Sequence, residues 1–341
     1  MTDRRAEFSA DRAWEDLRAL TQIGPRVIDT QGNVQARNYI QAQLEKLNLE
    51  VKIDEYDVMA HLASETEDGE SQESEPRDGE PESDASSLIV RNISVTIPGQ
   101  QSSGSIMLIA PYDTQAFEEF DFVGANDGGS GAAVLLELSR VIAADPLPYA
   151  TEVVFVDGHA PFSVPEPDGA MWQEAGLAHL AITLSERSVS DIHLVVYLNR
   201  IGDADLHIVR DLLSHRIYRE EFFEAARRLG QTVVFQQDAP FESTGLKHQS
   251  LSAVGIRRIV SIVDTAYGGD EPPGLYAGTE QDTLDHCSPE SLGAVGGVVL
   301  EGLEAISKWL IKIERFSQLP LEASPESEQA AADSSGDETR R

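Results

Sequence analysis

Short, unbroken apolar runs in the chain alternate with longer stretches in which apolar residues recur every three or four positions. The short runs are typical of buried strands, and they lie at residues 106–110, 151–156, 192–198 and 258–263. Residues 50–58 and 88–97 are also predicted to be strands. Helical spacing predicts helices over residues 11–20, 34–47 and 220–230, after Ser130, and after Ser288, which is expected to be an N-cap. This succession of strands and helices predicts an α/β fold.

Two acidic residues flank the junction between the strand at 106–110 and the helix that begins near Ser130. Asp113 comes just after the strand, where open α/β sheets place their ligands. Asp127 lies in the glycine-rich segment 124–131, which is expected to lack regular structure. The sequence therefore predicts two carboxylates directed at one spot above the edge of the sheet.

Length and composition limit the domain organisation. The 341 residues can form one large α/β domain over residues 1–320. Residues 61–86 are rich in Glu, Asp, Ser, Gly and Pro, and they are expected to be a disordered acidic insertion. A second disordered, acidic segment is expected at residues 321–341.

Charge and apolar content exclude several classes of partner. The formal net charge of −33 repels nucleic acids and anionic membranes, so neither is an expected partner. No apolar run approaches the roughly 20 residues that span a bilayer. The first residues lack the apolar segment of a signal peptide, so a cytoplasmic location is expected. Cys287 is the only cysteine, which excludes an intrachain disulfide and a thiolate-rich zinc site.

Several motifs resemble those of the zinc-dependent exopeptidase family that contains bacterial aminopeptidases and the glutaminyl cyclases. They are Gly24-Pro25-Arg26, Tyr112-Asp113, the Gly-Ala-Asn-Asp-Gly-Gly-Ser-Gly segment around Asp127, Asp157-Gly158, Ile201-Gly202 and Asp282-Thr283. The resemblance implies a single three-layer α/β/α domain with a central mixed, mostly parallel sheet. It also implies a zinc site above the carboxyl ends of the strands.

The residues at the family's metal positions depart from the family pattern. Asp127 is the sole ligand position that is retained. The other ligand positions are occupied by Pro111, Ala160, Asn199 and Gly278. His159 stands at the family's general-base position, where a Glu is usual, and Arg200 adds a cation beside Asn199. Asp113 and His248 are further polar residues expected in the cleft. Because a catalytic zinc needs about three protein ligands and an open position, the resemblance implies that zinc binding is lost.

Several functional hypotheses follow. The favoured one is a non-catalytic homologue that needs no cofactor and binds a peptide or a protein in the vestigial cleft. The main alternative is an active zinc metallo-aminopeptidase or glutaminyl-peptide cyclotransferase with a rearranged metal site. Asp113, Asp127 and His159 could also form a weak, relocated metal triad. A last alternative is a hydrolase outside the family that uses His159 or His248 with an Asp.

Overall fold

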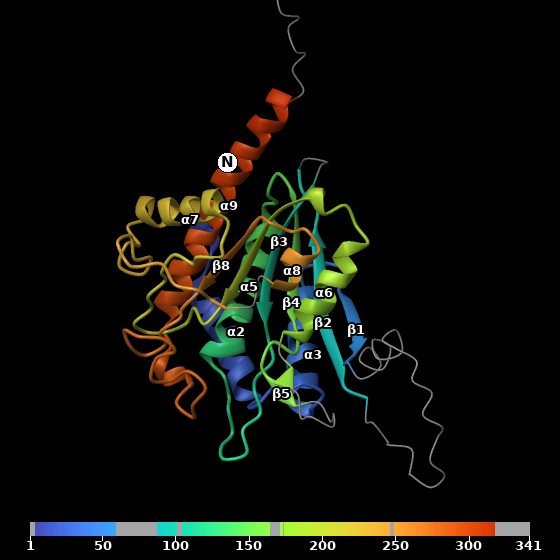
Figure 1. The fold of residues 1–341 in the computed structure, drawn as a ribbon, viewed down its shortest axis with the longest axis vertical. Helices are drawn as coiled ribbons and strands as arrows, with labels where there is room; N and C mark the ends of the chain where they lie inside the picture. The colour runs from blue at the N-terminus through green and yellow to red at the C-terminus, as the bar shows by residue number, and fades with distance from the viewer. Residues whose placement is uncertain are drawn as a thin grey trace, which may run out of the picture.

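The computed structural model describes residues 4–58, 87–100, 104–163, 171–172, 174–245 and 249–317 (Figure 1). The segments predicted to be disordered, at 61–86 and 321–341, lie outside these residues, and so does His248. No helix in the described part of the chain is long and apolar enough to cross a bilayer.

A six-stranded sheet forms the centre of the fold. Its strands are β1 (Lys52–Asp57), β2 (Ile89–Ile97), β3 (Ser105–Pro111), β4 (Ala150–Val156), β7 (Ile192–Asn199) and β8 (Ile259–Val263), in the order β1-β2-β4-β3-β7-β8. The pairs β1/β2 and β2/β4 are antiparallel, whereas β4/β3, β3/β7 and β7/β8 are parallel. The predicted mixed, mostly parallel sheet is therefore confirmed. Since β3, β4 and β7 are parallel, their carboxyl ends meet at one edge.

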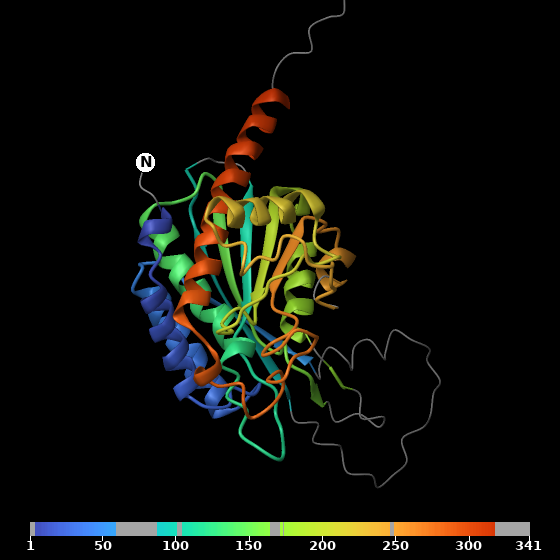
Figure 2. The ribbon, with the colours of Figure 1, turned by 90° about the vertical axis from the view of Figure 1, so that its left-hand side faces the viewer.

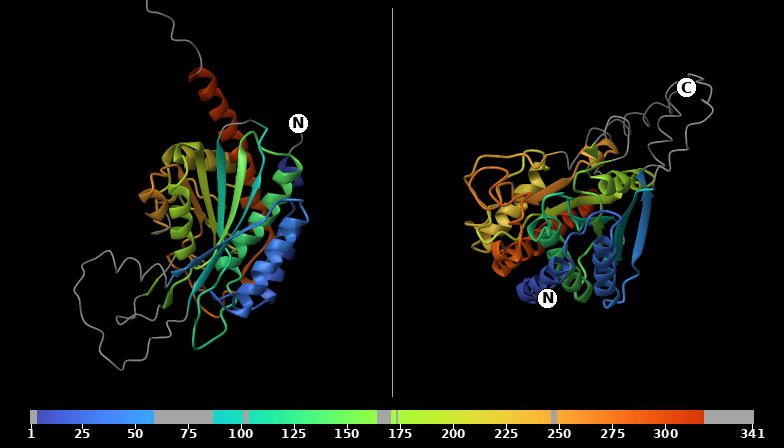
Figure 3. Two further views of the ribbon diagram at one scale, coloured as in Figure 1. Left: turned by 90° about the vertical axis from the view of Figure 1, so that its right-hand side faces the viewer. Right: turned by 90° about the horizontal axis from the view of Figure 1, so that it is seen from below.

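Helices cover both faces of the sheet. The larger apolar cluster joins one face to α2 (Ala10–Gln22), α3 (Gln31–Glu45), α5 (Gly131–Ala144), α7 (Arg216–Arg228) and α9 (Pro289–Ser317). The other face packs on α6 (Ala175–Ser185) and α8 (Gln249–Ala253). Figures 2 and 3 show the sheet between these two layers. The shorter elements are α1 (Arg4–Glu7), β5 (Phe162–Ser163), β6 (Met171–Trp172), η1 (Asn126–Ser130), η2 (Val189–Asp191) and η4 (Leu284–His286).

Side-chain alternation along β3 shows why this strand is apolar throughout. Ile106 and Leu108 belong to the larger cluster, whereas Met107 and Ile109 belong to the smaller one. All seven residues of the strand are buried, as expected for a parallel strand that is covered on both faces. The strand predicted at 106–110 and the helix predicted after Ser130 are both present.

The structure differs from the sequence prediction at the glycine-rich segment 124–131. This segment contains the short π-helical turn η1, although Asp127 and Gly128 have non-helical backbone angles. Gly128 has a φ of 77°, and a Cβ at this position would collide with the carbonyl oxygen of Asp113. The segment is thus ordered by a close approach of two backbones, which local composition does not reveal.

Arg26 links the amino-terminal turn to the loops at the carboxyl edge of the sheet. Its side chain is fully buried and donates hydrogen bonds to the carbonyl oxygens of Tyr112 (2.8 Å), Val123 (2.6 Å) and Gly124 (2.8 Å). Its backbone N–H donates to Thr114 Oγ1 at 2.7 Å. Burial lowers the pKa of Arg26 to about 10, so the guanidinium stays charged at neutral pH. Arg26 therefore fixes the loop that leads to Asp127.

Replacing Arg26 is expected to destabilise the fold strongly. In Arg26→Met, the carbonyl groups of Tyr112, Val123 and Gly124 lose their donors, so the free energy of unfolding should fall by roughly 3 kcal/mol or more. Urea unfolding followed by circular dichroism measures this loss. Arg18→Met is the matched control, because within the described part of the chain Arg18 forms only an exposed ion pair with Glu15. This change should alter stability by about 1 kcal/mol or less. Equal stability of the two variants would contradict the structural role of Arg26.

Candidate functional site

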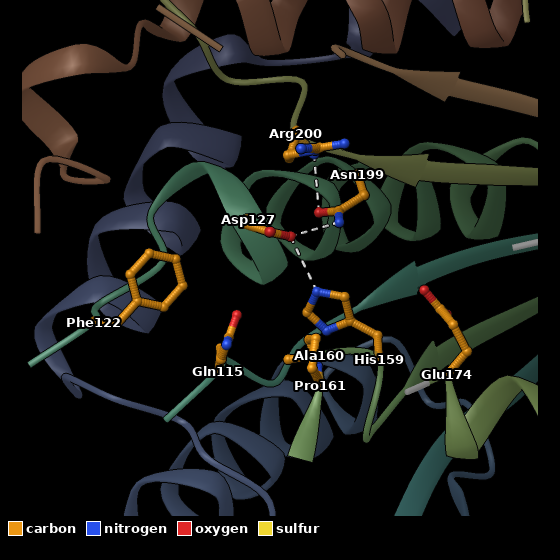
Figure 4. Close-up of a pocket in the computed structure, with 9 residues that line it drawn as sticks. All are labelled: Gln115, Phe122, Asp127, His159, Ala160, Pro161, Glu174, Asn199 and Arg200. Atoms are coloured by element: carbon orange, nitrogen blue, oxygen red, sulfur yellow. Dashed lines mark hydrogen bonds and ion pairs between the residues drawn. The ribbon is translucent and has the colours of Figure 1, made fainter. Parts of the chain in front are cut away.

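A cavity of about 180 Å³ opens above the carboxyl ends of β3, β4 and β7 (Figure 4). Such a position is the usual ligand site of an open α/β sheet. The residues that line it come from the loops after these strands, from η1 and from the segment before α6. They are Gln115, Phe122, Asp127, His159, Ala160, Pro161, Glu174, Asn199 and Arg200.

His159 lies between the carboxylates of Asp113 and Asp127, which the sequence analysis predicted to lie close together. Its Nδ1 is 2.6 Å from Asp113 Oδ1, and its Nε2 is 3.0 Å from Asp127 Oδ1. The histidine is 6% exposed and Asp113 is 1% exposed. A ring nitrogen can bind an ionised carboxylate only if it carries a hydrogen, so the doubly protonated imidazolium satisfies both contacts to ionised carboxylates. The side chains form an ion triad, which we call the Asp–His–Asp triad.

The electrostatics of the triad agree with this protonation state. Burial alone would lower the pKa of His159, but the charge of Asp113 and the hydrogen bonds to both carboxylates raise it to about 10. Asp113 is held in turn by the backbone, because Oδ1 accepts from the N–H of His159 at 3.1 Å and Oδ2 from the N–H of Ala160 at 3.2 Å. The site thus contains its own positive charge between two negative ones.

Asp127 is oriented by two residues from distant parts of the chain. Asp282 accepts hydrogen bonds from the N–H groups of Asn126 (2.6 Å) and Asp127 (3.0 Å). Asn199 donates through Nδ2 to Asp127 Oδ1 at 2.7 Å, and its Oδ1 accepts from the N–H of Gly128 at 3.0 Å. Burial, opposed by the hydrogen bond from Asn126, raises the pKa of Asp282 to about 7. Sequence analysis identified Asp282 only as part of a motif, because its hydrogen bonds to η1 depend on the tertiary fold.

The remaining family ligand positions offer no carboxylate or imidazole donor for zinc. Pro111 is the buried last residue of β3, and the methyl group of Ala160 lines the cavity. Gly278, which has a φ of 66°, has no side chain and therefore cannot bind a metal ion through one. The amide of Asn199 is already bonded to η1, as described above. These residues do not fit a catalytic zinc, which needs about three protein ligands.

The Asp–His–Asp triad does not supply such a ligand set either. It brings together the three residues of the hypothetical relocated metal site, but both ring nitrogens of His159 already contact carboxylates. Within the described ranges, no group of three His, Cys, Asp or Glu residues could hold a metal ion. The geometry also disfavours His159 as a hydrolytic base, since Nε2 faces Asp127 instead of a nucleophile.

Three further residues, Cys287, Glu174 and Arg200, bear on the chemistry of the site. Cys287 is buried beside the hydroxyl of Tyr267, and burial raises the pKa of its thiol, so this cysteine is not an activated nucleophile. Glu174, which lines the cavity just before α6, was missed in the sequence because α6 itself was not predicted. Arg200 was noted in the sequence as a cation, and the structure places it at the cavity.

Comparison with known proteins gives one family match and many similar structures. Peptidase family M28 matches residues 92–160, a segment that contains the whole Asp–His–Asp triad. No curated protein matches the sequence. A glutaminyl cyclase from an Acidobacteriales bacterium is 25% identical with a TM-score of 0.73, and the match covers 89% of this chain and 96% of that chain.

Two further structures show the same fold at lower identity. A glutaminyl cyclase from Porphyromonas gingivalis is 21% identical, with a TM-score of 0.70 and coverage of 87% of this chain and 98% of that one. A Zn-dependent exopeptidase from Parabacteroides distasonis is 20% identical, with a TM-score of 0.69 and coverage of 88% and 98%. The resemblance read from the sequence is therefore confirmed: in its fold and in its M28 segment, the chain is a glutaminyl cyclase-like and zinc exopeptidase-like protein.

Proposed function

We propose that this protein is a non-catalytic homologue of the zinc exopeptidases and glutaminyl cyclases that acts by binding a ligand in its cleft. The observation that carries the proposal is the position of His159 between Asp113 and Asp127. In this arrangement the imidazolium supplies the positive charge that the two carboxylates need. A metal ion is then not required to hold the site together.

The residues expected to do chemistry in the family support the same proposal. His159 stands at the general-base position, but a base must accept a proton, and both ring nitrogens are engaged by carboxylates. Ala160 cannot bind a metal. The rest of the scaffold, including the sheet, η1 and the turn at Arg26, still positions the loops around the cavity.

The cleft suits a ligand with a positively charged group. The carboxylates of Asp127 and Glu174 line it, and the protein has a net charge of −33. The amino terminus of a peptide or of a partner protein has this chemistry, whereas nucleic acids and anionic membranes do not. A cytoplasmic location stays a prediction from the sequence.

Metal analysis tests the proposal. After equilibration with zinc and gel filtration, the untagged protein should retain no stoichiometric zinc, because the donor set is incomplete. Aminopeptidase and glutaminyl-peptide cyclotransferase assays should stay at background. If about one zinc per chain is retained and lost in Asp127→Ala but not in the exposed control Asp121→Ala, the proposal fails. The alternative of an active zinc enzyme with a rearranged metal site would then hold.

Removing the imidazolium should weaken the fold. In His159→Gln, the neutral amide leaves Asp113 and Asp127 without a compensating charge, so the free energy of unfolding should fall by roughly 2–4 kcal/mol in urea titrations at neutral pH. Combining His159→Gln with Asp113→Asn should cost less than the sum of the two single changes. His207→Gln is the control, because its ring is 3.8 Å from an exposed Asp205 carboxylate. A His159→Gln variant as stable as this control would show that the triad is not a stabilising ion cluster.

A further inference from the structure

Two charged residues of the cavity have an unusual backbone conformation. Among the residues that the structure describes, the non-glycine residues with positive φ are Asp29, Asn48, Glu174 and Arg200. Asp and Asn adopt this left-handed region relatively easily, whereas Glu and Arg rarely do. Both Glu174 and Arg200 line the cavity. Such strained residues cluster at ligand sites when their surroundings hold them in place.

Backbone hydrogen bonds to the site hold both residues in this conformation. The N–H of Arg200 donates to Asn199 Oδ1 at 2.9 Å, and its carbonyl oxygen accepts from the N–H of Asp264 at 3.2 Å. The N–H of Glu174 donates to the carbonyl oxygen of His159 at 3.4 Å. The left-handed backbone at Arg200 and Glu174 therefore places one cationic and one anionic side chain on the wall of the same cavity.

The guanidinium of Arg200 has a hydrogen-bond donor that is not used within the described part of the chain. Within the described residues, its Nε is buried and has no hydrogen-bond partner. Asp264 contacts Arg200 through its N–H, and the Oδ1 of its carboxylate accepts from the N–H of Ala266. Burial raises the pKa of Asp264 to about 7, and the positive charge of Arg200 opposes this rise, so the two side chains also interact electrostatically. A buried donor without a partner is costly, and a carboxylate is the group that a guanidinium binds best. The cavity thus favours a ligand carboxylate at Arg200.

The other charges of the cavity favour an ammonium group. The imidazolium of His159 is already shared between Asp113 and Asp127, so it leaves net negative charge on the triad. Glu174 adds a third carboxylate. The cavity volume of about 180 Å³ is below the range of drug-sized pockets. A small zwitterion fits this size and this charge pattern.

We propose that the cavity binds a free α-amino acid, with its carboxylate on Arg200 and its ammonium group on Asp127 and Glu174. Phe122 and Gln115 then lie on the wall available to the amino acid side chain. This inference rests on the proposed function of ligand binding in the cleft, and it replaces the amino terminus of a peptide with a free amino acid as the ligand. An internal residue or the amino-terminal residue of a long peptide lacks the free α-carboxylate that Arg200 would bind.

Isothermal titration calorimetry of the full chain tests the inference. The proteinogenic amino acids are titrated one by one, and each is compared with its α-amide, which lacks the carboxylate, and its N-acetyl derivative, which lacks the ammonium group. At least one amino acid should bind, and both of its derivatives should bind about tenfold or more weakly. In Arg200→Gln, the acid and the amide should bind equally. The exposed Arg257→Gln is the matched control, which should bind like the unmodified protein.

The outcomes separate this inference from the proposed function. If no amino acid binds at millimolar concentration, the inference is wrong, while the zinc measurement still decides the proposed function. If α-amides bind as tightly as the acids, Arg200 does not recognise a carboxylate, and a peptide amino terminus becomes the better ligand. Because the comparison of ligands needs only the unmodified protein, the inference can be overturned even if Arg200→Gln does not fold.

Discussion

The site depends on one electrostatic constraint, which is that Asp113 and Asp127 need a positive charge between them. Two carboxylates directed at one partly buried point repel each other, and in a metalloenzyme a bound cation relieves this repulsion. In this protein the cation is a side chain, because the ring of His159 contacts Asp113 Oδ1 at 2.6 Å and Asp127 Oδ1 at 3.0 Å. The imidazolium, unlike a metal ion, cannot activate a water molecule as a Lewis acid. The same contact therefore explains both the stability of the cleft and its proposed lack of catalysis.

The rest of the fold holds the carboxylates of Asp113 and Asp127 beside the imidazolium of His159. Arg26 binds the carbonyl oxygens of the loop before η1, and Asp282 binds the N–H groups of η1 itself. Asn199 connects η1 to the end of β7. These buried polar contacts join segments far apart in the sequence, so each requires the complete sheet. A cleft that is fixed in this way is preorganised for a ligand even without a metal.

Sequence patterns predicted the elements better than the site. Both β3 and α5 were identified from the sequence. A strand that is buried on both faces is a continuous apolar run, and a helix that packs on a sheet has apolar residues every three or four positions, so each can be read from local sequence. Sequence also placed Asp113 and Asp127 at one edge, since parallel strands end there. It could not show that His159 lies between them, because that contact spans 46 residues. Glu174 was missed for a similar reason, as nothing local marks the start of α6 or its left-handed cap.

A crystal structure of the full chain soaked in zinc would test most directly whether His159 has replaced the metal. Data collected at the zinc absorption edge locate any bound ion independently of the protein atoms. We expect no anomalous peak in the cleft, with the His159 ring between Asp113 and Asp127. An anomalous peak about 2 Å from His159 Nε2 and from a carboxylate oxygen of Asp127 would contradict this, because it would show the histidine acting as a zinc ligand.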